Sequence, residues 1–269
     1  MLSGWSIKRV LIVVKTYPTP AHKGVEVSCT AGVTQEREWI RLYPVPFRFL
    51  EQEQQFARYQ WIDVQVRPAR NDPRPESHNL NDASIQVLKS PPPVNGWGAR
   101  EQILAPLRRP SLCHIDDHRQ KYGHPTLGLF RPARIKGLNI TQADEQNWTP
   151  SQLAALNQAR LDLGGSEPKR QLEKIPFEFR YEFDCAHPSC KGHSLMCTDW
   201  EMGQSFRKCR RSYGSQWEAK FRDKYEREMI ERRDTSFYVG TVHQHPNRWI
   251  IVGLFYPPKP KGPDLFTNL

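Results

Sequence analysis

Apolar and polar residues alternate with a period of two in several stretches of the chain, a pattern typical of β-strands with one buried face. The clearest stretch is Ile175–Asp184, and residues 25–33 and 61–66 repeat the pattern. Lys8–Lys15 is a continuous apolar run between basic residues, which predicts a strand buried on both faces. Trp39–Tyr43 predicts a returning strand. We therefore expect a β-rich N-terminal part, either a small barrel or a mixed sheet.

Helix signals are concentrated in the second half of the chain. Thr149 and Gln152 form a capping box around Pro150, which suits the first helical position. Thr198–Glu201 is a second capping box, and it predicts a helix that begins immediately. On the helix after that, aromatic residues and one methionine recur every fourth position, and we interpret this stripe as a core-facing side: Tyr213, Trp217, Phe221, Tyr225 and Met229.

These elements predict an α+β fold with an N-terminal and a C-terminal part. The predicted C-terminal part contains a strand, a zinc loop, helices and a hairpin formed by residues 237–241 and 249–256. We assign the parts as follows: a β-rich basic domain at 1–140, a connecting helix and linker at 141–171, a zinc-stapled α+β domain at 172–257, and an extended tail at 258–269. The polar boundary region equally fits a loop within one domain.

Charge indicates the kind of partner. The chain has 269 residues, a formal net charge of +10 and a pI of about 9.4, which favours an anionic partner. Arginine-rich stretches are interleaved with aromatic residues that can stack on bases, so we expect nucleic acid, either DNA or RNA. No basic amphipathic segment predicts membrane binding, and the apolar run Val10–Val14 is too short for a signal peptide. We therefore expect an intracellular protein, cytoplasmic or nucleoid-associated, that is not secreted.

Five potential metal ligands follow the Ile175–Asp184 strand within a few residues of one another. In a reducing compartment, clustered cysteines favour a metal site over disulfides. Four of them have the spacing C-x4-C-x2-H-x3-C, and we predict that they hold a structural Zn²⁺ ion: Cys185, Cys190, His193 and Cys197. This ligand set is similar to that of CCHC zinc knuckles over about a dozen residues, although the first two intervals have the reverse order of size.

The fourth ligand is the open point in this prediction. His187 lies inside the same segment and competes with Cys197 for that position. His243 or His245, in the turn of the predicted hairpin, can also supply it. Because four protein ligands leave no open coordination position, we expect a structural ion and not a catalytic one.

The densest positive run follows the second capping box, and we predict that it contacts phosphate: Arg207, Lys208, Arg210 and Arg211. Residues 218–233 also contain many cations, but acidic residues lie among them at pairing distances. We therefore interpret the second set as a solvated helix face. Basic and aromatic residues on the N-terminal strands would also suit a small barrel with an oligonucleotide-binding face.

Three functions remain open, led by a non-catalytic nucleic-acid-binding protein or a subunit of a nucleic-acid-processing assembly. The second is a metal-dependent nuclease, in which paired carboxylates beside imidazoles hold a cation that activates water: Asp116, Asp117, His114 and His118. A polar turn between two elements explains that segment more simply. The third is an adaptor that binds an acidic protein partner.

Overall fold

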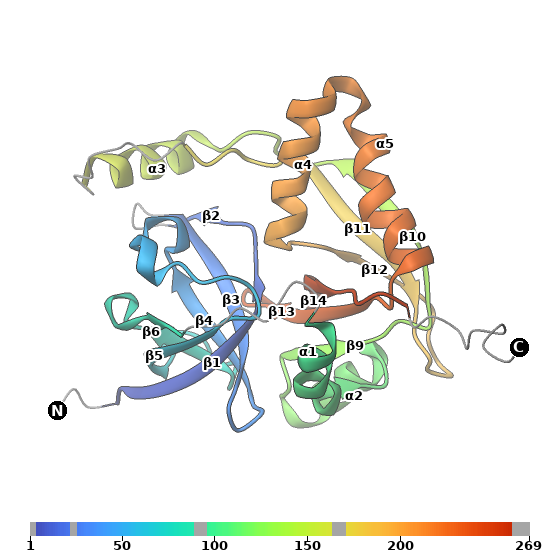
Figure 1. Ribbon diagram of the computed structural model, residues 1–269, viewed down its shortest axis with the longest axis horizontal. Helices are drawn as coiled ribbons and strands as arrows, with labels where there is room; N and C mark the ends of the chain where they lie inside the picture. Colours follow the sequence, from blue (N-terminus) through green and yellow to red (C-terminus); the bar gives the residue numbers. More distant parts are fainter. Residues whose placement is uncertain (1–3, 22–25, 89–95, 163–170, 260–269) are drawn as a thin grey trace, which may run out of the picture.

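The alternating N-terminal stretches form strands in the computed structural model, which describes residues 4–21, 26–88, 96–162 and 171–259 (Figure 1). The predicted tail from residue 260 onward lies outside these residues. The N-terminal strands are β1 (Ser6–Lys15), β2 (Thr19–Pro20), β3 (Glu26–Thr34), β4 (Trp39–Val45), β5 (Trp61–Pro68), β6 (Ser77–Leu80) and β7 (Gln86–Val87). Three short 3-10 helices lie between them: η1 (Phe47–Phe49), η2 (Gln52–Gln54) and η3 (Asp82–Ser84).

Five of these strands close into a barrel, which is one of the two alternatives predicted from the sequence. The ring runs β1–β3–β4–β6–β5 and returns to β1, because β1 pairs with β3 on one side and with β5 on the other. All pairs in the ring are antiparallel except β4–β6, which is parallel. Counted along the chain, the strand order is first, second, third, fifth, fourth, which corresponds to that of OB-fold barrels.

The barrel wall is apolar on both sides of β1. Val10 and Ile12 point into the barrel interior, where they meet Ile40 and Ile62 in one buried cluster. Leu11, Val13 and Val14 belong to a second cluster, which joins the barrel to strands of the C-terminal part. This two-sided burial confirms the interpretation of a fully buried strand for Val10–Val14, whereas Arg9 is exposed and Lys8 and Lys15 are partly exposed.

The remaining elements build the C-terminal part. Its strands are β8 (Arg108–Arg109), β9 (Leu127–Phe130), β10 (Arg134–Gln142), β11 (Phe177–Asp184), β12 (His193–Met196), β13 (Ser236–Val242) and β14 (His245–Phe255). Its helices are α1 (Trp97–Leu104), η4 (Ala105–Leu107), α2 (Leu112–Tyr122), α3 (Pro150–Asp162), α4 (Trp200–Tyr213), η5 (Gly214–Gln216), α5 (Trp217–Arg222) and the π-helical continuation η6 (Asp223–Arg232). In the described part of the chain, no helix combines the length and apolar character needed to cross a membrane.

Two sheets meet along β12 and β14. One has the order β8–β9–β13–β14 and the other β10–β11–β12, and a bridge between Cys197 and Ile251 links them. We grouped residues 1–140 as one domain from the sequence; in the structure, β9 pairs with β13 and β10 pairs with β11. The segment from β8 to β10 therefore shares its sheets with the C-terminal strands.

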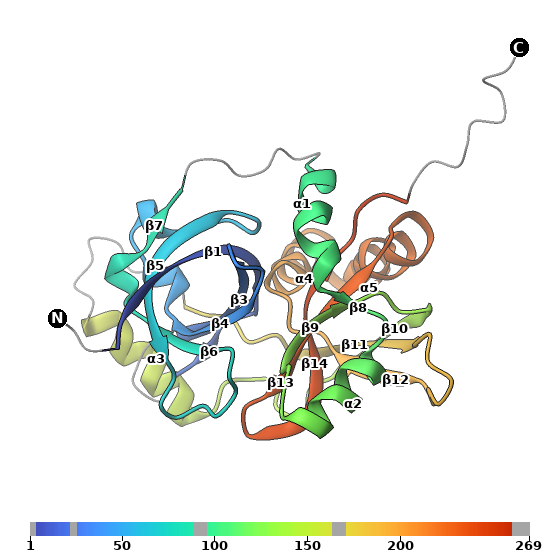
Figure 2. The same ribbon diagram turned by 90° about the horizontal axis from the view of Figure 1, so that it is seen from below.

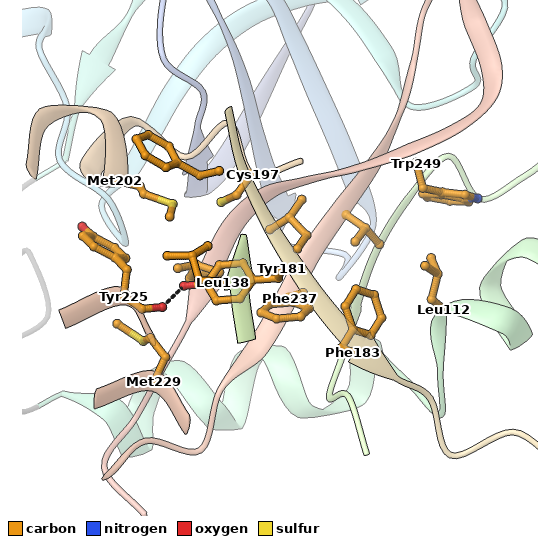
Figure 3. Packing of buried hydrophobic residues seen from close by; sticks show 14 of the residues in the cluster. Leu112, Leu138, Tyr181, Phe183, Cys197, Met202, Tyr225, Met229, Phe237 and Trp249 are labelled. Carbon is orange, nitrogen blue, oxygen red and sulfur yellow. Dashed lines mark hydrogen bonds between the residues drawn. The ribbon is translucent and has the colours of Figure 1, made fainter. Parts of the chain in front are cut away.

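Helices α4 and α5 pack on the sheet that contains β11, as Figure 1 shows. Tyr181 of β11 is buried there and donates a hydrogen bond to the backbone carbonyl of Tyr225 (Figure 3). The predicted core stripe is correct for its last four members, Trp217, Phe221, Tyr225 and Met229, which are all buried. Tyr213 is the exception, because it ends α4 beyond the sheet and is 47% exposed.

Both capping boxes correctly predict the start of a helix. In the box at Thr198–Glu201, however, the N-cap is Asp199 and not Thr198. Thr149 and Gln152 cap α3 reciprocally, through bonds of 2.9 and 3.3 Å. In α4, however, Asp199 accepts the amide of Met202 at 3.1 Å and is the N-cap. Thr198 is unavailable because its amide and its hydroxyl both donate to the carbonyl of Ile251 in β14.

Candidate metal centre and basic surface

Three cysteines and one histidine meet at the edge of the β10–β11–β12 sheet. Cys113, Cys185, Cys190 and His193 place their ligand atoms within 4.8 Å of one another. Cys113 Sγ lies 3.3 Å from His193 Nε2. Within the described residues, this is the one group of three or more cysteine, histidine and acidic side chains that is gathered closely enough to hold a metal ion.

Three of the four ligands are positioned by the end of a regular element, and Cys190 lies in the loop between β11 and β12. Cys113 lies in the first turn of α2, which Ser111 caps by accepting the amide of His114 at 3.0 Å. Cys185 directly follows β11, and His193 begins β12. The turn between them needs Gly192, whose φ of +86° lies in the left-handed region. The hairpin from β11 to β12 thus presents three ligands to a fourth from a separate helix.

The electrostatics of the group depend on burial and on bonds to sulfur. Burial, followed by the neighbouring Cys185 and Cys190 thiols, raises the pKa of Cys113 to about 12. For Cys190, burial acts upward, but the amides of Cys185 and Gly192 donate to its Sγ at 3.2 and 3.4 Å and lower its pKa. Burial lowers the pKa of His193, which keeps its imidazole neutral and able to coordinate.

The structure gathers three of the four expected ligands and replaces the fourth. Cys197 is not a member of the group, because it is buried in the core beside Met202 (Figure 3). Its amide donates to the carbonyl of Phe179, and it forms an isolated bridge with Ile251 directly after β12. The helix α2 supplies Cys113 instead, from far upstream in the sequence.

The other proposed fourth ligands are occupied elsewhere or lie apart. His187 faces Asp117 at 3.7 Å and Ser189 Oγ at 2.9 Å. His243 lies 3.4 Å from Asp72 of the barrel, and His245 is exposed. None of them belongs to the four-residue group.

The candidate nuclease segment forms helix α2 and not the polar turn that we considered simpler. Asp116 is fully engaged: Trp249 donates to it at 2.7 Å, Gln120 at 2.7 Å and Arg119 at 3.0 Å. Burial acts to raise the pKa of Asp116, but these donors outweigh it and lower the pKa. The ring of His118 faces the carbonyl of His124 at 2.8 Å. Asp116, Asp117, His114 and His118 do not form a ligand group in the described structure.

The predicted phosphate-binding run divides into one paired and three unpaired cations. Arg207 forms an ion pair with Glu173 at 2.6 Å and is half-buried. Lys208, Arg210 and Arg211 are exposed, and none forms an ion pair within the described residues. Arg207 is therefore tied to the protein, whereas the other three are available to solvent.

The second cationic set behaves as predicted for a solvated helix face. Arg222 pairs with Glu218 at 2.9 Å and with Glu226 at 2.8 Å. The other ion pairs of this face are Arg227 with Asp223 and Arg233 with Glu228. Lys220, Lys224 and Arg232 are exceptions, since all three are exposed and none forms an ion pair in the described structure.

The C-terminal part packs against the face of the barrel that we considered as an oligonucleotide-binding surface. In OB-fold barrels, the second and third strands carry that surface. Here the corresponding β3 and β4 pack against the C-terminal part: the ring of Trp39 lies 6.2 Å from that of Tyr238, and Arg41 is 2% exposed. Arg41 donates to the hydroxyl and the carbonyl of Thr126, at 3.1 and 3.0 Å.

Comparison with known families matches the division of the chain into two parts. The family described as domain of unknown function DUF8757 matches residues 108–269, which is more than half of the chain. The protein belongs to this family. A second family, domain of unknown function DUF8758, matches residues 6–106. The DUF8757 region contains all four residues of the Cys3His group. A search of curated proteins found no significant match.

Proposed function

We propose that the protein binds nucleic acid through the end of the α4–α5 hairpin, and that a zinc ion at the Cys3His group holds the surrounding fold together. We call the binding surface the basic tip and define it by Lys208, Arg210, Arg211, Tyr213, Lys220 and Lys224. Figure 1 shows this end of the hairpin projecting away from the sheets. A projecting surface of this kind is accessible to a large partner.

The proposal rests on the lack of ion pairs at the tip in the described structure. None of its five cations forms an ion pair in the described structure, although Arg207, Arg222, Arg227 and Arg233 on the same helices all do. Unpaired cations can neutralise phosphates and release counterions. Cations at a helix C-terminus also stabilise the helix dipole, but that effect accounts for Arg210 and Arg211 alone.

An exposed aromatic side chain lies among these cations. The Nζ atom of Lys220 lies 5.9 Å from the ring centroid of Tyr213. Nucleic-acid-binding surfaces that lack sequence preference combine such rings, which stack on bases, with cations that follow the backbone. The tip has both components.

The chemistry of the donor set supports zinc. Three thiolates and one imidazole are a set that structural zinc sites use, and four protein ligands leave no position for substrate. The ion would join α2 to the β11–β12 hairpin, where His187 of the hairpin also lies 3.7 Å from Asp117 of α2. Zinc would also remove the cost of burying the cysteine thiols as thiolates.

The test is the affinity for labelled single- and double-stranded DNA and RNA across a salt series, with reaction products examined on a gel. In the variant Lys208→Gln with Arg211→Gln, we expect weaker binding and a slope of log K against log salt that is smaller by about two. The matched control, Arg37→Gln with Arg70→Gln, removes the same charge from exposed barrel positions. Equal losses in both variants would contradict binding at the tip.

The same experiment separates the alternatives. Cleavage that depends on Mg²⁺ and is lost in Asp117→Asn would favour the nuclease hypothesis. If the protein binds none of the four ligands at low salt, the proposal is wrong and an acidic protein partner becomes the better hypothesis.

A further inference from the structure

A cavity lies where the barrel meets the C-terminal part, at the start of α4 and therefore at the opposite end of that helix from the basic tip. It has a volume of about 240 Å³, and its lining includes Arg58, Tyr59, Trp97, Arg100, Glu201 and Tyr256. These residues come from the segment before β5, from α1, from the start of α4 and from the end of β14. Figure 2 shows α1 beside the barrel at this junction. The cavity therefore depends on both parts of the molecule.

The two arginines of the cavity differ in how well they are satisfied. Arg58 is buried, and it donates to the carbonyls of Val13 and Leu254 and to the carboxylates of Asp199 and Glu201. Its side chain needs no further partner. Arg58 is therefore structural: it ties the barrel to the start of α4.

Arg100 has no comparable partners. Its guanidinium carbon lies 4.3 Å from the ring centroid of Tyr59 and 4.8 Å from that of Trp97. It forms no ion pair within the described residues, and its buried Nε has no hydrogen-bond acceptor there. A buried N–H group without an acceptor is costly, so an acceptor that enters the cavity would relieve that cost. A guanidinium held on aromatic rings presents its edge for paired bonds to phosphate.

The walls of the cavity are aromatic. The rings of Trp97 and Tyr256 lie 5.5 Å apart, and both are half-buried. Tyr59 has a φ of +63°, which a bulky side chain rarely adopts. The surrounding structure thus holds a tyrosine in an unfavourable backbone conformation beside Arg100. Strained residues of this kind often accompany ligand sites.

We propose that this cavity binds one nucleotide, with its phosphate on Arg100 and its base against the aromatic walls. Glu201 is 46% exposed on its side chain and can accept a hydrogen bond from a ribose hydroxyl or a base amino group. Asp199 and Glu201 both pair with Arg58, which leaves Arg100 as the arginine of this lining without an ion pair in the described structure, so the cavity suits one phosphate better than a triphosphate. The nucleotide is either free or the terminal residue of a strand.

The experiment is calorimetric titration of the full-length protein with AMP, GMP, CMP and UMP, with adenosine, with inorganic phosphate, and with short oligonucleotides with and without a 5′-phosphate. We expect at least one mononucleotide, or a 5′-phosphorylated oligonucleotide, to bind, and Arg100→Gln to weaken binding by about tenfold or more. The control Arg109→Gln removes an exposed arginine on β8 and should leave the affinity unchanged. Arg100→Lys tests the same role if Arg100→Gln does not fold, since it keeps the charge but loses the planar pair of donors.

The arms of the experiment separate the sources of the nucleotide. Binding of mononucleotides identifies a free ligand, whereas binding that needs an oligonucleotide with a 5′-phosphate identifies a strand end; both support the proposal. Adenosine binding as tightly as AMP, phosphate binding as tightly as AMP, or unchanged affinity in Arg100→Gln would each overturn it. So would the failure of every nucleotide to bind. The proposal does not rest on the basic tip, whose variants leave this cavity intact.

Discussion

The barrel and the C-terminal part are stabilised in different ways. The barrel interior is largely aliphatic, and a closed ring of strand pairs surrounds it. The C-terminal core is rich in aromatic rings, such as Phe183 and Phe237 at 5.3 Å, and its two sheets join through a bridge between Cys197 and Ile251 and through packed side chains. A closed ring of strands leaves no edge and can hold itself together. An assembly of two sheets and several helices needs further links, and a metal ion at the Cys3His group would provide one between α2 and the β11–β12 hairpin.

The largest effect that this comparison predicts is loss of the metal ligand Cys113. In Cys113→Ser, we expect the protein to lose its zinc and the C-terminal part to lose about 4 kcal/mol or more of unfolding free energy. Cys197→Ser is the matched variant, because it places a hydroxyl in the core without touching the ligand group, and we expect it to keep the ion. Metal analysis of the purified proteins, together with denaturant unfolding, measures both effects. If Cys113→Ser keeps zinc and Cys197→Ser loses it, then Cys197 and not Cys113 is the fourth ligand.

The same comparison explains what could be predicted from the sequence. Alternation fixes which face of a strand is buried, so the strands of the barrel and β11 could be recognised directly. Cys185, Cys190 and His193 could also be recognised as candidate ligands, because they lie close together in the sequence. Cys113 was missed as a ligand because only the packing of α2 brings it to the hairpin. The sole signal in the sequence was its status as a cysteine beside His114, in a segment that we interpreted differently.

Ion pairs, too, are hard to predict from the sequence when the two partners come from different elements. The sequence shows that Arg207 lies in a basic run, but its partner Glu173 comes from another element, so its pairing could not be predicted. The pairs within residues 218–233 could be, because spacings of three and four residues bring side chains together on a helix. Local patterns thus identify local pairs, whereas tertiary contacts decide which of the remaining cations are available to a partner.

The second prediction concerns the joint between the two parts. Arg41 is buried and bonds Ser77 of the barrel at 3.0 Å and Thr126 of the C-terminal part at 3.1 Å. Replacing it in Arg41→Met leaves these acceptors unpaired and should lower the unfolding free energy by about 2–4 kcal/mol. The control Arg9→Met removes an exposed arginine that pairs with Asp63, and should cost about 1 kcal/mol or less.

Thermal unfolding measured with two spectroscopic probes tests whether Arg41 couples the barrel to the C-terminal part. If Arg41 couples the parts, tryptophan fluorescence and far-ultraviolet circular dichroism should give coincident transitions in the native protein and separate ones in Arg41→Met. Coincident transitions in both proteins, with equal stability, would show that the apolar contacts of the interface are sufficient without this arginine.

The smallest predicted effect lies at the same interface and depends on pH. The Nζ atom of Lys15 lies 3.7 Å from the ring centroid of Phe47 and donates to the carbonyl of Phe56 at 3.2 Å. Burial lowers the pKa of Lys15 from 10.5 to about 8 in the folded protein. Between those two values the unfolded chain binds more protons, so the contribution of Lys15 to stability rises with pH. Below about pH 8 the lysine is charged in both states, and the cost of burying that charge is present in full.

Lys15→Met should therefore stabilise the protein at pH 7, by about 1–3 kcal/mol, because it removes a buried charge and keeps the apolar stem. The gain should shrink from pH 8 upward and vanish above about pH 10.5, where Lys15 is neutral in the folded and in the unfolded protein. Urea unfolding at pH 7, 8.5 and 9.5 measures the difference, with Lys220→Met as an exposed control that should change little. A gain that stays constant across this range would mean that packing, and not charge, sets the energetic cost of Lys15. Loss of stability at pH 7 would mean that its contacts with the aromatic rings outweigh the desolvation of its ammonium group, and that this cation stabilises the barrel.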